Sequence, residues 1–121
     1  MSTVRLSVVI PVYQGEETLP ELMAELESYT TPQQTPEGRE FVIEEVRLVW
    51  DRGPGRSEST LRELADRYTW VRPLWLSRNF GQHAATLAGM TSSGGDWIVT
   101  MDEDGQQDPS FIPVMLDTAY D

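Results

Sequence analysis

Apolar and polar residues along the chain divide it into short apolar runs and longer segments with helical periodicity. The apolar runs are rich in β-branched residues, end at Pro, Gly or charged residues, and are typical of buried strands. They cover Val4–Ile10, Phe41–Trp50, Val71–Leu76 and Asp96–Met101. In the segments between them, apolar residues recur at helical spacing, which predicts helices. These helices cover residues 18–29, 57–68 and 82–90, and a last helix follows residue 108.

The predicted helix ends carry recognisable signals. Thr18 followed by Glu21 predicts a capping box at the start of the first helix. Asp108 is the predicted N-cap of the last helix, with Pro109 at its first position, where the missing N–H costs nothing. The polar segment Thr30–Glu40 contains Pro and Gly and is predicted to be a loop within the domain.

Strands and helices alternate along the whole chain. This alternation predicts an α/β fold: a Rossmann-like, mostly parallel sheet with helices on both faces, formed by residues 1–121 as a single domain. Ligands bind outside the carboxyl ends of the strands in such sheets. Those ends carry the segments PVYQG, WDRGPG, SRNFG and DEDGQ. The unusual residues of the chain are therefore expected to lie along one edge of the sheet.

Composition excludes several classes of function. The chain has 121 residues, a formal net charge of −11 and no cysteine, so we expect no disulfide framework, no thiolate metal site and no nucleic-acid partner. All of its basic residues apart from the histidine are arginines, which excludes a P-loop and a lysine-dependent phosphoacceptor domain. It contains neither a run of about 20 apolar residues nor a signal peptide, which predicts a cytoplasmic location.

Three adjacent acids, Asp102, Glu103 and Asp104, follow the last predicted strand directly. If the strand conformation persists, Asp102 and Asp104 share one side and Glu103 points the other way. Together with the amide oxygen of Gln106, they offer hard oxygen ligands that suit Mg²⁺ or Mn²⁺. The alternative is an acidic loop that caps the next helix and is simply solvated.

Other polar residues at the same edge have two interpretations each. Asp51 precedes a Gly-Pro-Gly loop and is either a ligand contact or a turn-forming aspartate. Tyr13 either stacks on a base or packs against the protein. Arg78 suits a phosphate or a base edge, and otherwise forms a surface ion pair. His83, the only histidine, is more typical of a polar packing residue than of a catalytic acid or base.

Four motifs in register give a resemblance to a known family. They are LSVVIPVYQGEETLPELM, the acid at Asp51, LSRNFGQHAATLAGM and VTMDEDGQQDPSFIPVML. In order and spacing they resemble the family 2 glycosyltransferases of the GT-A fold. The segment SRNFGQHAATLAG is most similar to the branch that includes dolichol-phosphate mannose synthase and bacterial polyprenyl-phosphate glycosyltransferases.

The resemblance implies a nucleotide-diphosphate sugar as donor. Pro11 and Tyr13 match the first nucleotide-contacting loop of the family, and Asp51 matches an acid that hydrogen-bonds the base. The acids 102–104 match the DxD motif, which carries the metal bound to the diphosphate, and Gln106 matches a further metal-site ligand of the polyprenyl branch. The expected cofactor is accordingly Mg²⁺ or Mn²⁺, and the expected acceptor is a polyprenyl phosphate at the cytoplasmic face of a membrane.

The resemblance also implies an inverting reaction with a general base on the face opposite the leaving group. The family places that base after the DxD motif, which here means beyond residue 121. Two further departures concern the nucleotide site: Trp50 replaces the first of two acids, and Gln14-Gly15 replaces Asn-Glu.

Typical family members are much longer, so the chain is expected to be a donor-binding half, truncated at its C-terminus and inactive in isolation. The alternative is a non-catalytic nucleotide-diphosphate-binding or assembly module. Because later strands of the family sheet are missing, an exposed strand edge is expected to favour a homo-oligomer.

Overall fold

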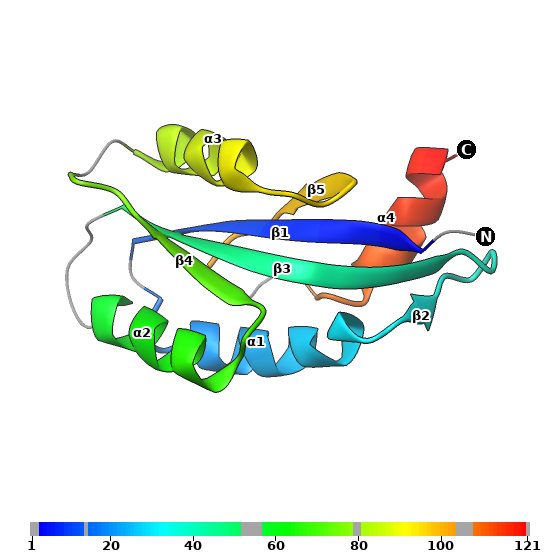
Figure 1. Cartoon of the computed structure of the whole chain (residues 1–121), viewed down its shortest axis with the longest axis horizontal. Helices are drawn as coiled ribbons and strands as arrows, with labels where there is room; N and C mark the ends of the chain where they lie inside the picture. Colours follow the sequence, from blue (N-terminus) through cyan, green and yellow to red (C-terminus); the bar gives the residue numbers. More distant parts are fainter. Residues whose placement is uncertain (1–2, 14, 52–56, 79–80, 104–107, 121) are drawn as a thin grey trace.

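A five-stranded sheet forms the centre of the computed structural model, which describes residues 3–13, 15–51, 57–78, 81–103 and 108–120 (Figure 1). The strands are β1 (Val4–Val12), β2 (Gln33–Gln34), β3 (Glu40–Trp50), β4 (Val71–Trp75) and β5 (Trp97–Thr100). Strand β1 lies between β3 and β5, and β4 pairs with the other edge of β3. These pairings are all parallel, which confirms the predicted sheet type.

Helices cover both faces of this sheet, as predicted. They are α1 (Leu19–Leu26), extended by the 3₁₀ helix η1 (Glu27–Thr30), and α2 (Ser57–Arg67), α3 (Gln82–Ser92) and α4 (Phe111–Tyr120). Figure 1 shows α1 and α2 below the sheet and α3 above it. No helix in the described ranges is both long and apolar enough to cross a bilayer.

The two faces of the sheet are packed differently. Large side chains are buried between the sheet and the pair α1 and α2, among them Leu6 and Leu48 of the sheet and Leu61 of α2. The face under α3 buries the small cluster Val9, Val49 and Ala85. At Gly89 of α3, an added Cβ atom would lie 2.5 Å from Cγ1 of Val9. Glycine at this position therefore lets α3 lie close to the sheet.

Three local predictions were wrong. The segment Thr30–Glu40 is not entirely a loop, because Gln33–Gln34 forms β2 and pairs antiparallel with the start of β3. The last helix begins at Phe111 rather than Pro109. Asp108 Oδ1 nevertheless accepts the backbone N–H of Ser110, two residues on, at 2.9 Å, as a capping side chain does. The first difference arises from strand pairing and the second from a turn before the helix. Neither can be predicted from the spacing of apolar residues.

The third wrong prediction is the capping box at Thr18. The hydroxyl group of Thr18 makes no cap hydrogen bond to α1, and Thr18 adopts helical backbone angles of φ −101° and ψ −31°. Instead, Oγ1 of Thr18 donates to the backbone carbonyl of Glu103. A long-range contact has thus replaced the local one that the sequence predicted.

The strand register brings three carboxyl ends together. Val12 at the end of β1 lies opposite Trp50 at the end of β3, and Val9 of β1 lies opposite Thr100 at the end of β5. The residues that follow these strands, including Asp51, therefore meet at one edge of the sheet, as the alternation predicted.

Candidate functional site

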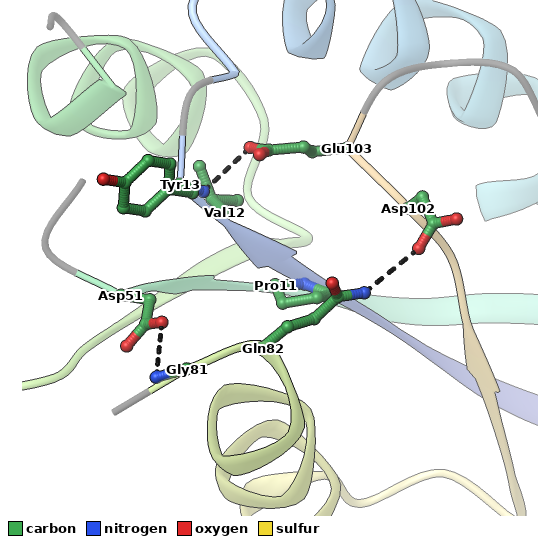
Figure 2. A pocket seen from close by; sticks show the side chains of 8 residues that line it. All are labelled: Pro11, Val12, Tyr13, Asp51, Gly81, Gln82, Asp102 and Glu103. Carbon is green, nitrogen blue, oxygen red and sulfur yellow. Dashed lines mark hydrogen bonds between the residues drawn. The ribbon is translucent and has the colours of Figure 1, made fainter. Parts of the chain in front are cut away.

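A pocket of about 520 Å³ opens at the carboxyl ends of β1, β3 and β5 (Figure 2). This volume lies within the usual range of small-molecule sites, roughly 300–1,000 Å³. Three strand ends and the start of α3 contribute the lining residues. They are Pro11, Val12, Tyr13, Asp51, Gly81, Gln82, Asp102 and Glu103.

The end of β1 forms an apolar and aromatic wall. Pro11 and Val12 are buried, whereas the side chain of Tyr13 is 46% exposed. Tyr13 donates its backbone N–H to Oε2 of Glu103 at 2.9 Å. The aromatic ring is therefore accessible while the backbone beneath it is fixed, and an exposed ring of this kind offers a surface on which a flat ligand group can stack.

Asp51 joins the end of β3 to the start of α3. Its side chain is only 4% exposed, and Oδ2 accepts the backbone N–H of Gly81 at 2.9 Å. Gly81 has a φ of 94°, a region of backbone conformation that favours glycine. The local sequence thus needs a glycine before α3, and the carboxylate of Asp51 holds it in place.

Asp102 joins the end of β5 to the same helix. Its side chain is exposed, and Oδ1 accepts a hydrogen bond from the side-chain amide of Gln82 at 3.4 Å. Its neighbour Glu103 is turned toward Tyr13 instead, so the two adjacent acids contact different loops (Figure 2).

The pocket therefore gathers three carboxylates, Asp51, Asp102 and Glu103, whose described partners are uncharged N–H groups. These donors orient the three carboxylates at the pocket. Carboxylate oxygens are preferred ligands of Mg²⁺ and Mn²⁺, and Asp102 presents its carboxylate at the pocket surface. One described carboxylate, that of Asp102, is therefore placed to be a ligand of a divalent cation.

The remaining residues of the predicted metal set, Asp104 and Gln106, lie outside the described residues. Within the described part of the chain, no three His, Cys, Asp or Glu side chains are grouped closely enough to hold a metal. A cation at Asp102 would accordingly need further ligands, and Mg²⁺ commonly completes its shell with waters and substrate phosphates.

Most candidates from the sequence line the pocket: Pro11, Tyr13, Asp51, Asp102 and Glu103. Arg78 follows β4, is exposed, and is not among the lining residues. His83 is also exposed and does not line the pocket.

The sequence interpretation missed three pocket residues: Val12, which lies between two candidates, and Gly81 and Gln82 before and in α3. The signal was present, because the segment SRNFGQ places a glycine at the end of a strand-to-helix loop, directly before α3. In a parallel sheet this loop belongs to the edge where ligands bind.

Comparison with protein families gives one match that covers nearly the whole chain. Residues 7–121 match the family described as Glycosyl transferase family 2. Among curated proteins, the undecaprenyl-phosphate 4-deoxy-4-formamido-L-arabinose transferase of Pseudomonas aeruginosa is 42% identical over 115 residues, which are 94% of this chain and 32% of the relative. The chain thus spans about a third of the length of this relative.

Two solved structures of other proteins show the same fold. The mannosyltransferase PcManGT from Pyrobaculum calidifontis, in complex with GDP-Man and Mn²⁺, has a TM-score of 0.69 and 17% identity, covering 86% of this chain and 28% of that chain. TarS from S. aureus, in complex with UDP-GlcNAc, has a TM-score of 0.66 and 18% identity, covering 96% of this chain and 30% of that chain. At these identities the similarity shows a shared fold.

Proposed function

The chain belongs to glycosyl transferase family 2 and has the GT-A fold, and from this we propose that it binds the nucleotide-sugar donor of a glycosyltransferase. One observation carries the proposal. The structure brings the aromatic wall at Tyr13 and the acids Asp51 and Asp102 into a single pocket at the carboxyl edge of the sheet. The base of a nucleoside diphosphate can stack on an exposed aromatic ring, and acidic side chains can hold a cation beside its phosphates.

We place the base of the nucleotide against the side of the pocket formed by Pro11, Tyr13 and Asp51. Tyr13 is exposed enough to stack on a base, and a carboxylate accepts hydrogen bonds from base N–H groups. The solved relatives bind GDP-Man and UDP-GlcNAc, which supports a nucleotide sugar as the class of ligand. Arg78, in the segment between β4 and α3, is proposed to contact the nucleotide from outside the pocket lining.

We place the diphosphate at the acidic side of the pocket, with Mg²⁺ or Mn²⁺ between the phosphates and the protein. Asp102 would hold the cation together with Asp104 and Gln106. PcManGT was solved with Mn²⁺, which supports a divalent cation in this fold. When bound, the cation would supply electrostatic stabilisation of the negative charge on the departing nucleoside diphosphate.

The residues of this chain then have three tasks in an inverting transfer. Tyr13 and Asp51 bind and orient the nucleotide, and Asp102 would hold the cation that neutralises the diphosphate. Gln82 orients the carboxylate of Asp102. Orienting the donor in this way lowers the entropic cost of reaching the transition state. The general base that deprotonates the acceptor is proposed to lie beyond residue 121.

We propose a polyprenyl phosphate as the acceptor, at the cytoplasmic face of a membrane. Support comes from the relative named undecaprenyl-phosphate 4-deoxy-4-formamido-L-arabinose transferase, which is 42% identical to this chain. A lipid-linked acceptor requires the donor site to work close to a membrane surface.

Isothermal titration calorimetry with UDP and GDP, each with Mn²⁺ and with EDTA, tests the donor site. We expect one of the nucleotides to bind in Mn²⁺ and to bind at least tenfold more weakly in EDTA. Absence of binding by both would contradict the proposal. Because the general base is proposed to lie beyond residue 121, a transfer assay with undecaprenyl phosphate needs a longer chain that carries this base. Transfer by that longer chain separates an enzyme from the alternative, a non-catalytic nucleotide-diphosphate-binding module, which binds without transferring.

A further inference from the structure

Glu103, the middle residue of the three adjacent acids, makes two contacts with the segment between β1 and α1. Its carboxylate Oε2 accepts the backbone N–H of Tyr13 at 2.9 Å, and its backbone carbonyl accepts the hydroxyl group of Thr18. Both contacts join parts of the chain that are far apart in sequence, by 90 and 85 residues respectively. Glu103 thus links the acidic segment to the aromatic wall of the pocket.

Two further observations show that the segment between β1 and α1 is built around this link. Thr18 stands at the N-cap position of α1, but its hydroxyl group donates to the carbonyl of Glu103 and accepts no backbone N–H of the helix. At Gly15, an added Cβ atom would lie 3.1 Å from Oε2 of Glu103 and 2.5 Å from Cδ1 of Leu19. The segment therefore passes too close to Glu103 and Leu19 to accommodate a side chain at residue 15.

The opposite side of the same segment is held by Ser57 at the start of α2. The backbone N–H of Gly15 donates to Oγ of Ser57 at 3.2 Å, and Ser57 is fully buried. The segment is thus fixed between α2 and Glu103. Without the Glu103 contact, this segment would be held on the Ser57 side alone, and Tyr13 would lose the hydrogen bond to its backbone N–H.

We propose that Glu103 is a positioning residue of the donor site, which couples the nucleotide wall at Tyr13 to the cation-binding edge at Asp102. This inference rests on the proposed function. Figure 2 shows why the two adjacent acids have separate roles: Asp102 is turned toward Gln82 of α3, whereas Glu103 is turned toward the backbone of Tyr13. Because the N–H of Tyr13 is uncharged, this contact needs an acceptor oxygen on residue 103 but no charge.

Three variants separate this role from direct binding of metal or nucleotide. Glu103→Gln keeps an acceptor oxygen and removes the charge, and Glu103→Ala removes both. Thr18→Val deletes the hydroxyl group that donates to the Glu103 carbonyl without changing any acid. A metal ligand would make the Gln variant as poor as the Ala variant and would leave Thr18→Val unaffected.

The test is calorimetry of UDP and GDP with Mn²⁺, using whichever nucleotide the unchanged chain binds more tightly. We expect Glu103→Ala to weaken binding about fivefold and Thr18→Val about threefold, with Glu103→Gln within about twofold of the unchanged chain. Thermal unfolding identifies any variant that fails to fold. The nucleotide affinities of the other two variants then test the proposal. The proposal would be overturned if Glu103→Gln and Glu103→Ala weakened nucleotide binding equally. It would also be overturned if binding were unchanged in both Glu103→Ala and Thr18→Val.

A measurement without ligand keeps this test separate from that of the proposed function. Amide hydrogen exchange at Tyr13 is expected to be slow in the unchanged chain and in Glu103→Gln, and at least tenfold faster in Glu103→Ala. If the unchanged chain binds neither nucleotide, the proposed function fails. Exchange at Tyr13 that is equal in all three proteins would instead overturn the positioning role of Glu103.

Discussion

Acidic side chains lie toward both ends of the parallel strands, and the two groups are held in different ways. At the carboxyl edge, Asp51 and Glu103 accept backbone N–H groups and Asp102 accepts the amide of Gln82. Toward the amino ends, the acids form ion pairs with arginines. Acids at the carboxyl edge thus accept N–H groups of the pocket segments, whereas those toward the amino ends pair with arginines that join distant parts of the fold.

Glu45 of β3 is the clearest case of an acid that serves stability. It is 1% exposed, and Oε2 accepts the Ser7 hydroxyl group and the backbone N–H of Gly94, each at 2.7 Å. Oε1 lies 3.1 Å from Nη1 of Arg72 and 3.1 Å from Nε of Arg47. Burial by itself raises the pKa of Glu45, but these hydrogen bonds and arginines outweigh it, and the pKa is lowered.

Asp96 and Asp117 behave in the same way. Asp96 accepts the backbone N–H and the guanidinium of Arg5, and these hydrogen bonds lower its pKa. Burial raises the pKa of Asp117 of α4, but hydrogen bonds from Thr35, from the backbone N–H of Glu37 and from Arg39 outweigh it, so the pKa is lowered. The ionised forms of these acids therefore stabilise the fold.

The largest expected effect is on stability, from Glu45→Ala. This substitution leaves two arginines without their shared carboxylate and should lower the free energy of unfolding by about 3 kcal/mol. Urea denaturation measures the loss. The matched control is Glu44→Ala, at the neighbouring position, where an exposed ion pair with Arg5 is worth less than about 1 kcal/mol. Equal losses in the two variants would show that burial beside two arginines makes Glu45 no more important for stability than an exposed ion pair.

Acidification should remove part of the same stabilisation. Groups whose pKa is lowered in the folded state stabilise it fully above their unfolded pKa values, and this contribution is lost as pH falls through the folded values. For Glu45 and Asp117 the loss begins near the ordinary values of 4.5 and 3.8 and continues below them. Melting temperatures measured from pH 6 downward should fall, and fall less steeply in Glu45→Ala. If melting temperature fell equally steeply with pH in the unchanged chain and in Glu45→Ala, Glu45 would not be a source of the acid sensitivity.

At the pocket, Asp102→Asn should act on binding and leave stability unchanged. We expect the affinity for UDP or GDP in Mn²⁺ to fall at least tenfold, about 1.4 kcal/mol, because an amide is a poorer ligand for a divalent cation than a carboxylate. The melting temperature should not fall. Asp66→Asn, an equal charge change at an exposed position of α2, is the control for calorimetry and should bind normally. Unchanged affinity in Asp102→Asn would exclude Asp102 as a cation ligand.

The smallest expected effect is on stability in Asp51→Asn. The amide oxygen can still accept the N–H of Gly81, so unfolding free energy should fall by less than about 1 kcal/mol. Asp51→Ala removes the acceptor and provides the comparison by denaturation. A large loss in the Asn variant would show that Asp51 needs its charge for folding and belongs with Glu45 rather than with the pocket acids.

The sequence by itself determined the order of strands and helices and the edge where the site forms. Periodicity located β1, β3 and the helices to within a few residues, because an apolar face must be buried against a sheet. The parallel arrangement then put Tyr13, Asp51 and Asp102 on one edge, since strands that run in the same direction end on the same side. These are consequences of local pattern and strand direction, which a single sequence contains.

Only the tertiary structure decided which groups these residues contact. Thr18 reads as a helix cap, yet its hydroxyl group reaches Glu103, 85 residues away. Glu45 is one of several charged residues in the sequence of its strand, yet it is buried with Ser7 of β1, 38 residues away. This contact lies next to an irregularity in the β1–β3 register between Leu6 and Ser7. A hydrogen-bonding group takes whichever partner the packed helices and strands bring within about 3 Å, and that choice depends on the positions of distant segments rather than on neighbours in the sequence.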